Sequence, residues 1–221
     1  MSFKKIFYAG CMFACTSMAN ADMVLNFDCI TPNNATNCAI GEAQLSTSIS
    51  AFGVNQVLFR IINSGIAKAV VSEVYFDNGP LLNIANLIDK DEGLGGLADV
   101  DFTGGGATPP NLPNANNIVP AFVATHILSA DADSPSPKNG IGAGEWLGIV
   151  FNIMSNGTVN NVYSGIMSGD LRVGLHVKDF DSGMSASFVN ATPMPLPAAL
   201  WFFVTALMGG YLSVRKKIAI K

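Results

Sequence analysis

The stretch Glu145–Ile153, which reads EWLGIVFNI, decides the fold because it is the strongest β-strand in the sequence. Its large apolar residues Leu147, Ile149 and Phe151 stand at every second position. Successive side chains of a strand point to opposite faces, so these residues would form one apolar face. The stretch therefore predicts a half-buried strand in an antiparallel sheet.

The same two-residue period recurs along the chain between turn residues. The clearest cases are Glu42–Ile49, Gln56–Ile62, Val70–Phe76, Leu171–Phe180 and Ala186–Val189. Further candidates are a strand or a buried turn at Leu81–Ile88 and short strands at Ala98–Phe102 and Phe122–Leu128. Many short strands separated by turns predict an all-β fold, an antiparallel β-sandwich of the jelly-roll-like kind.

One short helix is expected among the strands. Thr158 can cap it, and the apolar residues that follow recur at helical spacing: Val159, Val162, Tyr163, Ile166 and Met167. Two stretches rich in glycine and proline, residues 89–117 and 131–144, are expected to be mainly loops.

The N-terminus has the pattern of a secretory signal peptide. Two lysines precede an apolar run at Ile6–Ala14, and the small residues Ala19-Asn20-Ala21 follow. Cleavage is expected between Ala21 and Asp22, so residues 1–21 would be removed after passage through an export translocase. A lipoprotein-type cleavage before Cys11 is the alternative, although the apolar run before that cysteine is brief.

The predicted exported domain, residues 22–192, is strongly acidic. It holds six of the 12 lysines and arginines and all 16 acidic residues, a net charge of −10. Such a surface repels nucleic acid and anionic lipid, so DNA and RNA are excluded as partners. Only two cysteines remain in it, Cys29 and Cys38, and an oxidising compartment would join them in a disulfide.

The C-terminal residues 193–221 predict a membrane-spanning helix. The cluster Pro193-Met194-Pro195-Leu196-Pro197 cannot lie inside a helix. Ala198–Val214 then carries no charge and would extend about 25 Å as a helix, near the lower limit for a bilayer. Arg215, Lys216 and Lys217 form a basic stop that should remain cytoplasmic. A plain membrane anchor is the alternative interpretation.

The order of proline motif, apolar span and basic stop resembles the PEP-CTERM class of bacterial sorting signals, in its VPLPA-type variant. The matching residues are Pro195, Leu196, Pro197 and Ala198, with Met194 where valine is usual. The resemblance implies an exported protein that is held briefly in the inner membrane and processed by an exosortase. The mature protein would then reach the cell surface or the extracellular space.

Most of the range 38–190 also resembles a group of exported domains that carry this signal. The pieces that carry the resemblance are Tyr75–Gly79, Pro110–Pro113, Gly144–Ile149, Leu171–Val177 and Ser187–Asn190. This resemblance supports location and fold, because the group brings no enzymatic activity with it.

Acidic pairs offer one candidate metal site. Asp131 and Asp133 stand two residues apart in a predicted loop, and calcium prefers several such oxygens from one loop. None of the acidic pairs has the full spacing of a calcium loop, so solvated turn residues are the favoured interpretation.

Glu145 beside Trp146 suggests sugar binding or cleavage, but packing of the indole is favoured over sugar stacking. Glycosidases need a second carboxylate in range, which the sequence does not identify. The two histidines, His126 and His176, have no partners at the spacing of a metal site or a catalytic triad.

These patterns predict a non-enzymatic surface or extracellular-matrix protein, without a required cofactor, that is associated with exopolysaccharide or the envelope. A carbohydrate- or calcium-binding module is the first alternative. A secreted hydrolase is the second.

Overall fold

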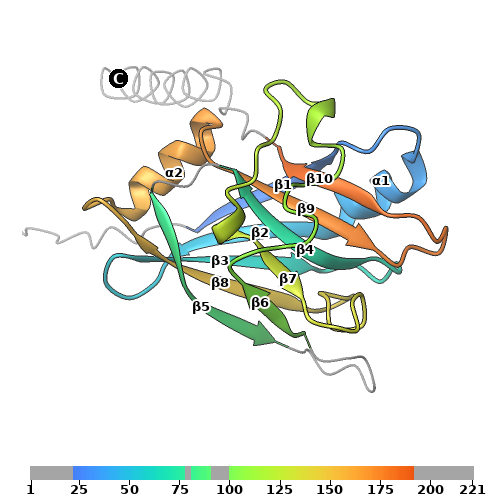
Figure 1. Ribbon diagram of the computed structural model, residues 1–221, viewed down its shortest axis with the longest axis horizontal. Helices are drawn as coiled ribbons and strands as arrows, with labels where there is room; N and C mark the ends of the chain where they lie inside the picture. Colours follow the sequence, from blue (N-terminus) through green and yellow to red (C-terminus); the bar gives the residue numbers. More distant parts are fainter. Residues whose placement is uncertain (1–21, 78–80, 91–99, 192–221) are drawn as a thin grey trace, which may run out of the picture.

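The computed structural model describes residues 22–77, 81–90 and 100–191 (Figure 1). The strands are β1 (Met23–Cys29), β2 (Leu45–Ala51), β3 (Gln56–Asn63), β4 (Val70–Asp77), β5 (Leu82–Lys90), β6 (Phe102–Gly104), β7 (Ala130–Ala132), β8 (Trp146–Ile153), β9 (Arg172–Lys178) and β10 (Ala186–Asn190). The α-helices are α1 (Ala35–Gln44) and α2 (Val159–Ser168), and the 3-10 turns are η1 (Ala115–Asn117) and η2 (His126–Leu128).

All ten strands belong to one antiparallel sheet. Their order is β5-β8-β3-β2-β1-β10-β9-β4-β7-β6. The first and last strands of this order approach each other through side chains, because a Cβ on Gly104 of β6 would lie 3.3 Å from Ile84 of β5. The sheet is therefore nearly closed, and the prediction of a mostly antiparallel β fold is confirmed.

Strand β1 joins the two halves of the sheet. It pairs with β2 through Met23–Asn26 and with β10 through Phe27–Cys29. The half β5-β8-β3-β2 and the half β10-β9-β4-β7-β6 thus meet along the first strand of the described chain. For convenience, we call them the first half and the second half.

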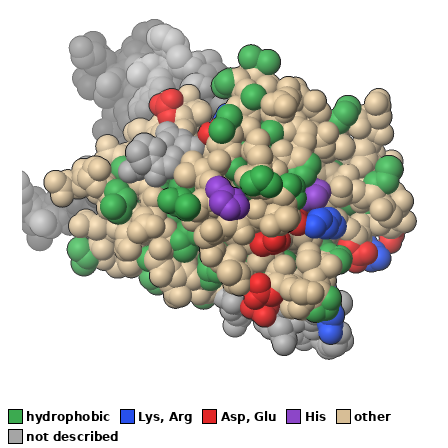
Figure 2. All heavy atoms as spheres, in the orientation of Figure 1, with side chains coloured by type: hydrophobic (Ala, Val, Ile, Leu, Met, Phe, Trp, Pro, Cys, Tyr) green, Lys and Arg blue, Asp and Glu red, His purple; other side chains and the backbone are tan. Residues whose placement is uncertain are grey.

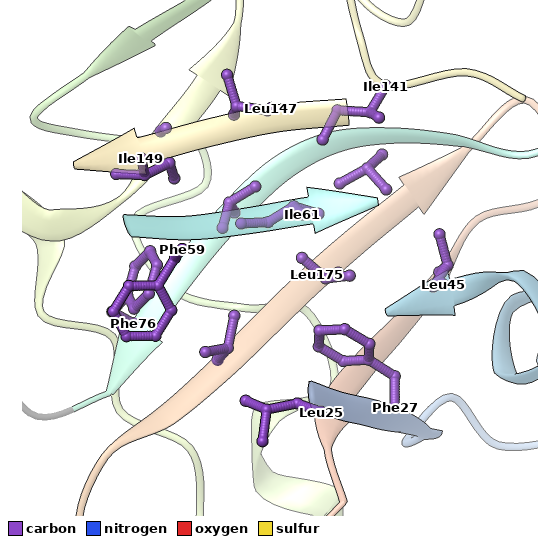
Figure 3. Close-up of a cluster of buried hydrophobic side chains, with 14 of the residues drawn as sticks. Leu25, Phe27, Leu45, Phe59, Ile61, Phe76, Ile141, Leu147, Ile149 and Leu175 are labelled. Carbon is purple, nitrogen blue, oxygen red and sulfur yellow. The ribbon is translucent and has the colours of Figure 1, made fainter. Parts of the chain in front are cut away.

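The core lies between the two halves (Figure 3). Alternation places Val57, Phe59 and Ile61 of β3 inside, each at 0 % exposure. Phe59 and Phe151 from the first half make edge-to-face contacts with Phe76 from the second half, with ring centroids 5.2 and 4.8 Å from that of Phe76. The two halves therefore share one aromatic centre.

The helices lie at opposite ends of the sheet (Figure 1). Helix α2 is confirmed: Thr158 makes a capping box with Asn161, and the buried residues Val162 and Ile166 enter the core. Met167, expected on the same apolar face, is instead 57 % exposed. The C-cap Gly169 has φ +78°, a left-handed conformation that glycine adopts without steric cost.

Helix α1 was not predicted, because residues 35–44 (ATNCAIGEAQ) show no regular apolar stripe. The helix packs through Gly41, where a Cβ would lie 2.2 Å from the ring of Phe188. The predicted strand at Glu42–Ile49 therefore begins later, at Leu45. Leu45, Thr47 and Ile49 do lie on one buried face, as expected.

Two other predictions were wrong, and the short strand predicted at Ala98–Phe102 begins only at Phe102, as β6. Phe122–Leu128 is not a strand, since it ends in the 3-10 turn η2 and holds only an isolated bridge at Ala124. Asp131 lies on strand β7 rather than in a loop. Both errors fall in stretches of mixed polarity whose conformation depends on packing over the second half of the sheet.

The predicted disulfide between Cys29 and Cys38 is present, and it ties the end of β1 to the first turn of α1. Replacing both cysteines with alanine should lower the free energy of unfolding by about 2–3 kcal/mol, because the short crosslink no longer restricts the unfolded chain. Urea unfolding of the two chains, each with and without reductant, measures this. A reductant effect of similar size on the double variant would contradict the assignment.

The predicted signal peptide and sorting segment lie outside the described residues. Within residues 22–77, 81–90 and 100–191, neither α1 nor α2 has the length and hydropathy needed to cross a bilayer.

Candidate functional site

A pocket of about 580 Å³ lies where β8 begins. Three segments form it: the β3–β4 connection, the loop before β8, and the turn after β9. Its lining residues are Ile66, Lys68, Ala69, Val70, Pro137, Lys138, Gly140, Gly142, Ala143, Glu145 and Asp179. The volume is within the range of small-molecule sites, roughly 300–1,000 Å³.

The pocket has a mixed charged wall. Lys68 Nζ lies 2.9 Å from Asp179 Oδ1, and both side chains are exposed by more than a third. The hydrogen bond from Lys68 to Asp179 raises the pKa of the lysine above its ordinary value. Lys138, also exposed, makes no ion pair within the described part of the chain. The wall therefore offers one paired and one unpaired ammonium group.

Glu145, which the sequence singled out, lies buried at this pocket. Its Oε2 atom accepts a hydrogen bond of 2.6 Å from the backbone N–H of Gly142, which holds the preceding turn. Close packing fixes the same loop at Gly140, because a Cβ there would lie 2.5 Å from the carbonyl oxygen of Val71. One wall of the pocket is therefore a tightly positioned backbone turn.

Trp146 points away from the core, on the outer face of the first half. The guanidinium carbon of Arg60 lies 4.0 Å from the centre of its ring, within cation–π range. The indole is half-buried, and Arg60 covers one of its faces. This arrangement supports the interpretation of Trp146 as a packing residue.

Asp131 and Asp133 make separate local contacts. Asp131 Oδ2 accepts a hydrogen bond from the backbone N–H of Thr108, and Asp133 Oδ1 accepts one from Thr103 Oγ1. Burial raises the pKa of Asp131. In the described ranges, no three acidic, histidine or cysteine side chains come together as metal ligands. The two aspartates therefore tie β7 and the residue after it to β6 and to the loop that follows β6.

A buried charged cluster lies on the outer face of the second half. Glu73 of β4 is 1 % exposed, and its Oε2 atom lies 2.7 Å from Nδ1 of His176 on β9. These two atoms are at ion-pair distance but outside hydrogen-bond geometry. Lys178 Nζ donates a hydrogen bond to the other oxygen, Oε1. Figure 2 shows charged and histidine side chains gathered on one part of this face.

The cluster belongs to a polar row that crosses five strands. The register places Ser187, His176, Glu73, Asp131 and Thr103 opposite one another in turn. Ser187 is fully buried, and its backbone N–H donates to Thr31 Oγ1 in the disulfide-bonded loop. Ser187 and His176, at the β10 end of this row, are therefore covered, which favours a structural role for His176.

The long connection between β6 and β7 covers the rest of this face. Arg172 fastens the loop by donating hydrogen bonds to Asp77 and to the carbonyl oxygens of Pro120 and Ala121. Beneath the loop, Tyr75 donates its hydroxyl to the carbonyl oxygen of Pro109, and burial raises the pKa of this tyrosine. These contacts hold the connection against the sheet, where Tyr75 and Phe122 belong to a second, smaller apolar cluster.

His126 has different contacts from His176. It opens η2 and is exposed, with its ring against Gly106, where a Cβ would lie 2.9 Å from Nε2. His126 and His176 thus have separate surroundings, and the structure does not bring them to one site.

Sequence reasoning found Glu145 but did not identify Lys68, Lys138 or Glu73 as site residues. Lys68, Lys138 and Asp179 come from three loops that are distant in sequence, and no motif links them. Glu73 did carry a signal, since it is the single charged residue in the apolar stretch Val70–Phe76. A charge at such a position needs a buried partner.

Comparison of the chain with protein-family models, curated proteins and solved structures gave no match.

Proposed function

We propose that this chain is an exported, non-enzymatic protein of the bacterial cell surface or extracellular matrix. A signal peptide, residues 1–21, directs it to the export translocase. The sorting segment, residues 193–221, anchors it transiently in the inner membrane and presents it to an exosortase. The mature domain then associates with the envelope or with extracellular polysaccharide.

The Cys29–Cys38 disulfide is the observation that carries this proposal. Structural disulfides persist in oxidising compartments and are rare in the cytosol, where thiols are kept reduced. The acidic domain agrees with this location, because its charge of −10 favours solubility and disfavours anionic partners inside the cell. In the same interpretation, the two halves of the nearly closed sheet face each other as the two layers of a jelly-roll-like sandwich.

Fractionation of three chains tests the proposal. The full chain should be exported, lose residues 1–21 and contain oxidised Cys29 and Cys38. A chain lacking residues 193–221 should be exported but not retained at the membrane. A chain in which Pro195, Leu196 and Pro197 are alanine should remain as an unprocessed membrane form, because the span is intact and the motif is lost.

Antibody detection, intact mass and thiol labelling give the location, the processing and the redox state of each chain. Recovery of the full and shortened chains in the cytoplasm, both with free thiols, would refute the proposal. Equal processing of the motif variant and the full chain would refute the exosortase step.

A further inference from the structure

The pocket at the start of β8 combines two surfaces that a sugar ring needs. Its apolar part comes from Ile66, Val70, Pro137 and Ala143, and its polar part from two lysines and two acidic residues. A pyranose presents C–H groups on its faces and hydroxyls at its rim. Each hydroxyl can both donate and accept a hydrogen bond, so a wall with both kinds of group matches it.

We propose that this pocket binds a neutral sugar residue of a polysaccharide. The inference deepens the proposed function, because it rests on the association of the domain with extracellular polysaccharide. The Lys68–Asp179 pair supplies a donor and an acceptor 2.9 Å apart, a spacing that adjacent hydroxyls of one ring can bridge. Lys138, an exposed lining residue, supplies a further donor.

Charge selects a neutral sugar over an acidic one. Two lysines and two acidic residues line the pocket, so neither sign of charge predominates there. The domain as a whole has a charge of −10, which opposes the approach of a polyanion. A uronate carboxylate in the pocket would also lie near Asp179.

The backbone keeps the pocket open. Gly140 packs so closely against Val70 and the Val71 carbonyl that any side chain there would displace the loop. The loop is also held by the hydrogen bond from Gly142 to Glu145 and by those from Asn63 Nδ2 to the carbonyl oxygens of Ala69 and Ile141. A preformed pocket lowers the ordering cost of binding.

Calorimetry with the full chain tests this inference. The protein is kept in a zwitterionic detergent without a sugar headgroup and titrated with neutral tetrasaccharides of glucose, galactose, mannose and N-acetylglucosamine, and with tetragalacturonate. At least one neutral tetrasaccharide should bind with a Kd at or below the order of 1 mM, and tetragalacturonate should bind at least about tenfold more weakly.

Two pocket variants locate the site. Asp179→Asn and Lys138→Ala should each weaken binding about tenfold, because each removes a charged hydrogen-bonding partner of a hydroxyl. Asp170→Asn is the matched control, since Asp170 is an exposed acidic residue after α2 that bonds Ser168 and does not line the pocket. It should bind as the parent chain does.

The outcomes separate this inference from the proposed function. Absence of heat with every neutral tetrasaccharide, tighter binding of tetragalacturonate, or equal affinity of Asp179→Asn and Asp170→Asn would overturn the pocket assignment. Export and processing of those variants would still be normal if the proposed function is correct. Sugar binding by a chain that stays in the cytoplasm would support the pocket and refute the proposed location.

Discussion

Replacing Glu73 with alanine is expected to lower the free energy of unfolding by about 3–5 kcal/mol. The carboxylate is 1 % exposed and faces both His176 and Lys178. Its removal leaves the buried imidazole and the half-buried ammonium group without their common partner, and opens a cavity between β4 and β9. The urea midpoint of the full chain, followed by circular dichroism, measures the loss.

A second acid–lysine pair provides the control. Lys68 and Asp179 are both exposed by more than a third, so Lys68→Ala should cost no more than about 1 kcal/mol. If Glu73→Ala does not fold, Lys178→Met serves instead, because it removes the charged partner and retains most of the apolar side chain. A loss below about 1 kcal/mol for both Glu73→Ala and Lys178→Met would show that the cluster does not stabilise the fold.

The second large effect is expected at Phe76, where alanine should cost about 3–5 kcal/mol. Phe76 is fully buried, and its ring contacts Phe59 and Phe151 from the opposite half of the sheet. Truncation would leave a void between the two halves, which rigid strands cannot close. Thermal and urea unfolding of the variant measure the cost.

Phe52→Ala is the matched control, because Phe52 is 39 % exposed and follows β2 outside the core. It should change stability by less than about 1 kcal/mol. A double-mutant cycle on Phe59 and Phe76 should also give a coupling energy of about 0.5–1.5 kcal/mol. Additive effects of the two truncations would mean that the halves do not share one aromatic centre.

Strands with strict alternation could be predicted from the sequence. In β3, the period of two places Val57 and Phe59 in the core, and the structure agrees. In β8 it places Leu147 and Ile149 there, but Val150 on the other face is buried as well, so this strand is more than half-buried. Because successive side chains of a strand point to opposite faces, the sequence pattern by itself shows which face of such a strand is apolar. The exact pairing of strands depends on contacts between distant segments, so the order of the sheet did not follow from the sequence.

Strand β4 shows where alternation fails. The register shifts between Val71 and Glu73, and both Val71 and Val74 consequently lie in the core although they are three residues apart. A bulge of this kind adds one residue and changes the face that later side chains occupy. Glu73 therefore lies outside the core beside β9, at a position that the sequence pattern alone does not specify.

The candidate site was only partly accessible to sequence reasoning. Glu145 was identified through its neighbour Trp146, yet Trp146 packs against Arg60 and does not line the pocket. The pocket instead depends on Lys68, Lys138 and Asp179, which three separate loops bring together. Loop positions follow from tertiary packing, and a single sequence contains no direct record of them.

Strand β1 lies between β2 and β10 in the sheet, so the first described strand in sequence pairs with the last one in sequence. Of the described strands, β1 (residues 23–29) leaves the ribosome first and β10 (residues 186–190) leaves it last. The sheet consequently cannot be completed early in synthesis, because Phe27 of β1 pairs with Asn190 of β10. The sheet should therefore close only after nearly the whole domain has been synthesised, so a domain exported as proposed above would reach the translocase still unfolded.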